Sequence, residues 1–255
     1  MSGHSKWSSI KHKKAATDAK RGKILTKHSK ILAVAGRSDP SPETNAALRV
    51  AIANAKAENV PNENIDRILK KLSGEGKDAA VYSEQVYEGF GPDGIPFVVT
   101  ALTDNQNRTL PAVRTAFAKN GGTLGSTGSV MFQFDHVGVI TVETGGKSED
   151  ELFELVAEAG GEDFEWEAEE SEILTKFEDL SAVRNALEKK MTVKKSEPQY
   201  RAKDPKIISD AEMLRRVEKF VESVEDVDDV DEVFGGFDVD DSLAGENHLC
   251  NNFPD

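Results

Sequence analysis

The sequence has little of what builds disulfide frameworks, metal clusters or membrane spans. It contains a single cysteine, Cys250, which excludes an intrachain disulfide and a cysteine-based zinc site. One cysteine in a chain of 255 residues also fits a reducing compartment. No apolar run approaches the ~18–20 residues that a membrane-spanning helix needs. The basic N-terminus is followed by no apolar segment, so we expect no secretory signal.

Acidic side chains are scarce in the first part of the chain and abundant in the rest. Residues 1–77 hold 16 basic and 7 acidic side chains, a net charge of +9, whereas residues 78–255 hold 16 and 39, a net charge of −23. Positive charge gathered in one stretch is typical of a surface that binds a polyanion. The acidic remainder repels such a ligand. We therefore expect a polyanion to bind at the N-terminal end.

Residues 1–77 predict a basic arm followed by a small helical domain. Residues 1–16 have no apolar period, whereas an apolar stripe follows at helical spacing through Ile24, His28, Ile31 and Ala35. Gly36 is an expected stop for this helix. Ser41 before Pro42 predicts the start of a second helix, and Pro61 predicts the start of a third.

After residue 80 the apolar period changes to that of strands. The expected elements are strands at Val86–Phe90, Ile95–Leu102 and Val130–Phe134, a helix at Thr109–Lys119, a short strand at 206–209, a helix with a capping box from Ser209, and a strand at Asp229–Phe234. Together they predict an α/β domain made of residues 80–135 plus 205–238. The G-x-G-x-x-G match at Gly89–Gly94 lies between two strands, so it predicts a hairpin rather than a dinucleotide site.

Residues 137–203 follow the order β-α-β-β-α-β, which is the ferredoxin-like plan. A capping box at Ser148–Glu151 marks the start of its first helix. The chain is therefore expected to be an α+β protein of three domains. These are an N-terminal three-helix domain and two ferredoxin-like α/β domains, the third inserted into the second. Residues 241–255 are expected to form a disordered tail.

The candidate nucleic-acid-binding residues are mostly lysines of the arm and the first helix. They are Lys6, Trp7, Lys11, Lys13 and Lys14 in the arm and Lys20, Arg21, Lys23, Lys27 and Lys30 in the helix. Lysines neutralise phosphates and release counterions, and an exposed tryptophan can stack on an unpaired base. The helix lysines form one stripe of like charges, which repel one another unless an anion is bound. The alternative is an ordinary solvated surface, with Trp7 packed on the helical domain.

Two further segments leave alternatives open. The polar run Thr103–Thr109 joins a strand to a helix, so its side chains either cap that helix or contact phosphate or a base, with Arg108 as the charge. The run Gly121–Gly128 could offer backbone N–H groups to an anion. It lacks the lysine of a phosphate-binding loop, and we expect a flexible connection there.

No pattern predicts a metal site, a cofactor site or a catalytic centre. His4, His12 and His28 have no cysteine or acidic partner at ligand spacing, and the acidic stretch Glu222–Glu232 lacks the spacing of a calcium loop. No Ser/His/Asp or Cys/His set stands out. We therefore expect a protein that is not an enzyme and has neither cofactor nor metal.

Several co-linear segments resemble the YebC/PmpR family, whose members are described as probable transcriptional regulatory proteins. The matching stretches are Gly3–Trp7, Asp18–Lys23, Ala55–Arg67, Tyr87–Pro92, Leu102–Thr109, Val113–Phe117, Gly121–Val130 and Glu225–Phe237. The chain is also similar to the mitochondrial translational activator of cytochrome c oxidase subunit I. The resemblance implies a helical domain and two α/β domains, the third inserted into the second. The family motif begins at Gly3, so we expect no transit peptide.

We expect a non-enzymatic, nucleic-acid-binding regulator of gene expression in the cytoplasm, monomeric and without membrane contact. The resemblance implies DNA binding in transcription. The alternative that it implies is a ribosome-associated translation factor that binds ribosomal RNA and relieves stalled synthesis. A basic arm without an evident base-reading helix suits irregular RNA slightly better. Two other classes remain: an enzyme with its site between the α/β domains, and a scaffold that binds only proteins through its acidic body.

Overall fold

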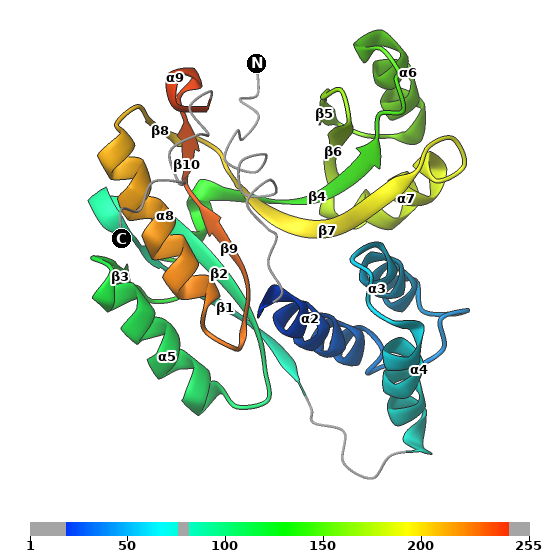
Figure 1. Ribbon diagram of the computed structural model, residues 1–255, viewed down its shortest axis with the longest axis horizontal. Coiled ribbons are helices and arrows are strands. Elements are labelled where there is room, and N and C mark those ends of the chain that lie inside the picture. The colour runs from blue at the N-terminus through cyan, green and yellow to red at the C-terminus, as the bar shows by residue number, and fades with distance from the viewer. Residues whose placement is uncertain (1–18, 76–81, 245–255) are drawn as a thin grey trace. The chain divides into compact units, whose positions relative to one another are not determined.

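The structure is a computed structural model that describes residues 19–75 and 82–244 (Figure 1). Buried side chains form three separate hydrophobic cores, one in the helical domain and one in each α/β domain. The chain packs as two compact units. One contains Gln85–Asp135 and the described residues from Arg201 onward, and the other contains the described residues of Arg21–Glu84 together with His136–Tyr200. Within these ranges no helix combines the length and apolar character needed to cross a membrane.

The N-terminal domain consists of helices whose apolar faces meet around fully buried leucines. The helices are α2 (Ala19–Ala35), α3 (Ala46–Ala57) and α4 (Asn62–Lys70), the last continued by a π-helical turn at Lys71–Glu75. Leu32 and Leu48 have no exposed surface. Helix α2 ends where the Gly36 N–H donates to Leu32 O at 2.9 Å. A Cβ at Gly36 would lie 2.6 Å from Leu72 Cδ1, so a side chain there would displace the packing.

The expected start of the second helix at Ser41 is wrong. Helix α3 begins at Ala46, and its N-cap is Asn45, whose side chain accepts from Leu48 N at 3.0 Å. The Asn45 amide also donates to Ala35 O at 2.7 Å. Asn45 is favoured because it caps the start of α3 and binds the end of α2 with the same side chain. Ser41 lies in the preceding turn, where its N–H donates to Asp39.

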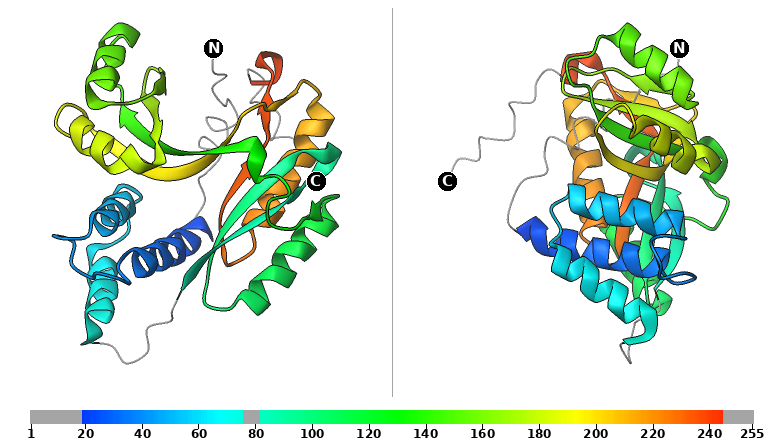
Figure 2. Two further views of the ribbon diagram at one scale, coloured as in Figure 1. Left: turned by 180° about the vertical axis from the view of Figure 1, so that it is seen from behind. Right: turned by 90° about the vertical axis from the view of Figure 1, so that its right-hand side faces the viewer.

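The second domain is a four-stranded sheet with two helices side by side on one face (Figures 1 and 2). The strands are β1 (Ser83–Phe90), β2 (Pro96–Thr103), β3 (Thr123–Leu124) and β9 (Val230–Gly235), in the order β3-β1-β2-β9, and the helices are α5 (Gln106–Lys119) and α8 (Ala211–Glu225). Phe220 of α8 lies at the centre of the core, with its ring centroid 4.7 Å from that of Phe97 and 4.9 Å from that of Phe117. The hairpin expected at Gly89–Gly94 is confirmed, with Gly91 N donating to Ile95 O.

The expectation of a flexible connection at Gly121–Gly128 is wrong. Part of it pairs with β1 as strand β3, and the residues after it wrap around the carboxylate of Glu88, which is 4% exposed. That carboxylate accepts from the backbone N–H groups of Gly128 at 2.6 Å, Val130 at 2.9 Å and Met131 at 2.8 Å. Gly128 has φ +85°, a backbone conformation that residues other than glycine rarely adopt. The segment does offer N–H groups to an anion, and that anion belongs to the chain itself.

Three further expectations for this domain need correction. Residues Met131–Gln133 form a 3-10 turn, so the expected strand at Val130–Phe134 is wrong. Helix α8 is capped by Asp210, which accepts from Glu212 N and Met213 N, rather than by Ser209. The start of the expected disordered tail is ordered, because Asp241–Ala244 form helix α9. An additional parallel pair joins β8 (Lys206–Ile208) to β10 (Phe237–Val239).

The inserted domain has the expected ferredoxin-like order. Its elements are β4 (Phe134–Glu143), α6 (Glu149–Ala159), β5 (Asp163–Glu165), β6 (Glu170–Lys176), α7 (Leu180–Leu187) and β7 (Val193–Ala202), and the sheet order is β5-β6-β4-β7. The capping box at Ser148 and Glu151 is confirmed. The sequence did not predict the contact that joins this domain to the helical domain. The side-chain amide of Asn54 donates to Ser196 O at 2.7 Å, and its side-chain oxygen accepts from Ser196 N at 3.1 Å.

The carboxylate of Glu88 yields a prediction about stability. Burial raises the pKa of this group, but the three backbone donors outweigh burial and the net pKa is lowered. Replacing Glu88 by Gln places an NH₂ group among N–H donors, so we expect the free energy of unfolding at pH 7 to fall by about 1–3 kcal/mol. Urea unfolding followed by circular dichroism measures this change.

The sign of the pH dependence follows from the lowered pKa of Glu88. Its stabilisation is fully present above the unfolded-state pKa of about 4.3 and is lost as the pH falls through the lower native value. The wild type should therefore lose more stability than Glu88→Gln between pH 7 and pH ~3. As a control, Glu154→Gln at an exposed position within α6 should change stability by less than about 0.5 kcal/mol. Equal stability of Glu88→Gln and wild type at pH 7 would contradict the assignment.

Candidate nucleic-acid interface

Helix α2 carries the described part of the basic N-terminal end. Lys23 is exposed and Lys27 is half-buried. The backbone of Lys20 and Arg21 is also part of helix α2. These residues give α2 a basic first half, in the domain with the positive net charge.

The expected exposed stripe of four lysines does not include Lys30. Its side chain is 8% exposed, and its Nζ lies 5.8 Å from the centre of the Tyr82 ring. A buried ammonium over an aromatic face is held by a cation–π interaction. Lys30 therefore contributes to the packing of α2 and does not extend the surface that begins at Lys23.

His28 fixes the basic helix to the rest of its compact unit. As expected, it is a packed side chain, 2% exposed, and its Nε2 lies 3.2 Å from Glu58 Oε2 at the end of α3. The contact with His28 lowers the pKa of Glu58 against the effect of burial, and the charge of Lys195 lowers it further. Lys195 Nζ lies 3.9 Å from the same carboxylate. The cluster thus joins α2, α3 and β7.

The other predicted contacts of the N-terminal end lie outside the described residues. They are Lys6, Trp7, Lys11, Lys13 and Lys14. Their role in binding stays a prediction from sequence.

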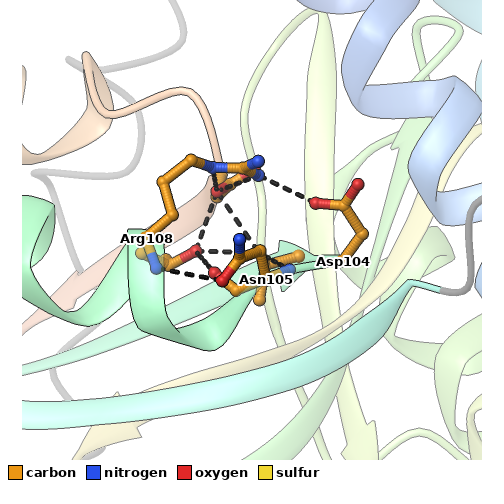
Figure 3. A network of polar contacts seen from close by, with 6 residues as sticks. Asp104, Asn105 and Arg108 are labelled. Carbon is orange, nitrogen blue, oxygen red and sulfur yellow. Dashed lines mark hydrogen bonds and ion pairs between the residues drawn. The ribbon is translucent and has the colours of Figure 1, made fainter.

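The remaining candidate, Arg108, lies in the first turn of α5, in a polar network around the buried Asp229 (Figure 3). Asp229 Oδ2 accepts from Arg108 Nη2 at 2.7 Å and Nε at 3.1 Å, and from the hydroxyls of Thr109 at 2.8 Å and Thr103 at 3.3 Å. Its backbone oxygen accepts from Leu102 N at 2.8 Å. One carboxylate therefore joins the end of β2, the start of α5 and the segment that leads into β9.

The capping alternative for Thr103–Thr109 is confirmed. Asn105 is the N-cap of α5, and its side-chain oxygen accepts from Arg108 N at 3.2 Å. Hydrogen bonds from Arg108 to Asp229 and Asp104 raise the pKa of its guanidinium. The Arg108 side chain is nevertheless 55% exposed, so one edge of the guanidinium remains accessible to an anion. Contact with phosphate therefore stays compatible with the structural role.

Sequence reasoning missed a stack of aromatic rings on the inserted domain. The ring of His136 lies between those of Phe177 and Tyr200, with centroid distances of 4.1 and 4.7 Å and interplanar angles of 24° and 15°. Phe177 is 45% exposed and His136 is also exposed. His136 comes from β4, Phe177 from the turn after β6, and Tyr200 from β7. No local pattern joins residues so distant in sequence, so only the fold reveals the stack.

Comparison with known families accounts for nearly the whole chain. The family described as "TACO1/YebC protein N-terminal domain" matches residues 5–75, and that described as "TACO1/YebC second and third domain" matches residues 82–237. The chain belongs to the YebC family. The two matches cover the helical domain and both α/β domains, with their boundary in the undescribed segment 76–81.

Relatives in the family bear the name "Probable transcriptional regulatory protein". One from Enterococcus faecalis is 51% identical over 191 residues, which cover 74% of this chain and 78% of that protein. One from Corynebacterium glutamicum is 43% identical over 248 residues, which cover 96% and 98%. The crystal structure of a conserved hypothetical protein from Aquifex aeolicus matches with a TM-score of 0.80 and 39% identity, covering 88% of this chain and 92% of that one.

Asp229 yields a second prediction, because its buried carboxylate accepts hydrogen bonds from four donors. Replacing it by Asn removes the charge and sets an NH₂ group against some of these donors. We expect Asp229→Asn to lower the free energy of unfolding by roughly 2–4 kcal/mol. Thermal unfolding followed by circular dichroism measures the loss. The exposed Asp204→Asn serves as the control, and equal melting temperatures for the two variants would refute the role given to Asp229.

Proposed function

We propose that this YebC-family protein regulates gene expression in the cytoplasm by binding nucleic acid at its basic N-terminal end, without catalysing a reaction. The observation that carries the proposal is the division of charge, with a net charge of +9 in residues 1–77 against −23 in the remainder. A phosphodiester chain is attracted to the first part and repelled by the second. The exposed Lys23 and half-buried Lys27 on α2 belong to this surface.

The names of the relatives favour DNA as the nucleic acid, since they describe probable transcriptional regulatory proteins. On this proposal the arm and α2 neutralise the phosphates of a duplex. Phosphate contacts give affinity but no sequence readout. Regulation of particular genes would then need base contacts or a partner in addition.

Neutralising the basic side chains of α2 tests the proposal. In the variant Lys20→Gln, Arg21→Gln, Lys23→Gln, Lys27→Gln the helix is kept, because glutamine has a high helix propensity. The slope of log affinity against log salt for duplex DNA should become shallower by about 0.9 for each phosphate that the variant no longer neutralises. Fluorescence anisotropy over a series of salt concentrations measures this slope.

A matched control neutralises four exposed cations elsewhere in the same domain. These are Lys56, Arg67, Lys70 and Lys71 on α3, α4 and the turn after α4. The same change of net charge should leave the slope nearly unchanged. If the slope falls equally in both variants, only the overall charge matters and α2 is not the interface.

A second candidate, the ribosome-associated translation factor that binds ribosomal RNA, is favoured by the aromatic stack. Unpaired bases stack on exposed aromatic rings, and sequence-specific RNA recognition mostly uses such bases. The outer face of Phe177 extends the stack of Phe177, His136 and Tyr200. Duplex DNA has no unpaired base to place there.

Phe177→Ala tests this candidate. Removing one base–aromatic stack should weaken binding of an unstructured RNA oligonucleotide by about 1–3 kcal/mol, and leave duplex DNA binding unchanged. The control is Phe153→Ala, which removes a phenylalanine that is 60% exposed on α6. Equal RNA affinities for wild type and Phe177→Ala would dismiss the stack as a base platform.

Titrations against purified ribosomes and duplex DNA at ~0.15 M salt then decide between the candidates. Salt-resistant binding to ribosomes alone would remove the transcriptional one.

A further inference from the structure

The second domain contains a basic depression that the sequence analysis did not find. It is lined by Pro92 and Asp93 of the β1–β2 turn, by Lys119, Asn120 and Gly121 at the end of α5, and by Arg216 and Lys219 of α8. Its volume is about 360 Å³. That is near the lower end of small-molecule sites, which span about 300–1,000 Å³.

Cations dominate the lining of this depression. Among the described residues that line the depression, Asp93 is the only acidic one, and Arg216 Nη2 contacts its Oδ2 at 3.0 Å. Lys206 Nζ also donates to the backbone oxygen of Asp93 at 3.3 Å. Lys119 and Lys219 are exposed and, within the described part of the chain, have no hydrogen bond or ion pair with another side chain. The acid is thus already matched, and two lysines remain available for a ligand.

Helix electrostatics explains only part of this arrangement. Lys119 lies in the last turn of α5, where a cation is stabilised by the helix dipole. Arg216 and Lys219 lie in the middle of α8, away from either end, so no dipole favours them. They are also spaced by one helical turn, a separation at which like charges repel. Asp93 already offsets the charge of Arg216, so an anion bound between α5 and α8 would mainly offset the charges of Lys119 and Lys219.

We propose that this depression binds a backbone phosphate of nucleic acid, as a contact additional to the N-terminal end. The inference rests on the proposed function, because it gives the same ligand a second site. A phosphate there would accept from Lys119 and Lys219 and lie beside Arg216, whose fork-shaped guanidinium suits phosphate oxygens. The site lies in the acidic part of the sequence, so net charge by region conceals it.

The test compares two double variants with the same change of charge on the same two helices. Lys119→Gln/Lys219→Gln removes the lining lysines, and Arg114→Gln/Arg215→Gln removes exposed arginines that do not line the depression. Each full-length protein is titrated by fluorescence anisotropy against single-stranded RNA and duplex DNA over a salt series. The log–log salt slope of the lysine variant should be shallower by about 0.7–0.9 in total, because one phosphate is no longer neutralised, and the arginine variant should match the wild type. Circular dichroism melting confirms that both variants fold.

The outcomes separate this inference from the proposed function. If the wild type binds nucleic acid and the two double variants bind alike, the depression is not a contact and the proposed function stands. If the wild type binds neither nucleic acid, the proposed function fails, and this inference fails with it. Calorimetry with inorganic pyrophosphate separates a free anion from a backbone phosphate. Loss of pyrophosphate binding in the lysine variant, with unchanged nucleic-acid binding, would make the depression a small-anion site and overturn the assignment.

Discussion

The second domain depends on the antiparallel pairing of β2 with β9, strands that the inserted domain separates in sequence. Val99 faces Val233 in the middle of this pair, and both are buried in the core. At the end of the pair Asp229 collects donors from the end of β2 and the start of α5. The contact completes a domain whose two halves could not bury their apolar faces alone.

Buried carboxylates with complete sets of donors recur in this acidic chain. Glu88 is bound by three backbone N–H groups of the segment after β3, and Asp229 by a guanidinium and two hydroxyls. A buried charge without such donors would lower the free energy of unfolding by roughly several kcal/mol. Each carboxylate therefore specifies the conformation of the segment that supplies its donors. This chain thus uses part of its negative charge for structure.

Basic side chains are distributed differently from these carboxylates. Lys30 and His28 are buried and help to fix α2, whereas Lys23 on the same helix is exposed. Lys119 and Lys219 remain available at the depression of the second domain. Binding of a polyanion through several dispersed cations gives affinity that adds from weak contacts and decreases steeply with salt. This is the behaviour expected of a protein that holds nucleic acid mainly by its phosphates.

The sequence alone determined the α+β class, the ferredoxin-like order of the inserted domain and the positive N-terminal end, because periodicity and charge are local properties. It could not determine the cap of α3, since Asn45 is favoured over Ser41 by a bond to Ala35 in the preceding helix. It also could not show the fixed loop around Glu88, the stack of His136 between Phe177 and Tyr200, or the basic depression. Each of these unites residues from separate elements, so only tertiary structure decides them.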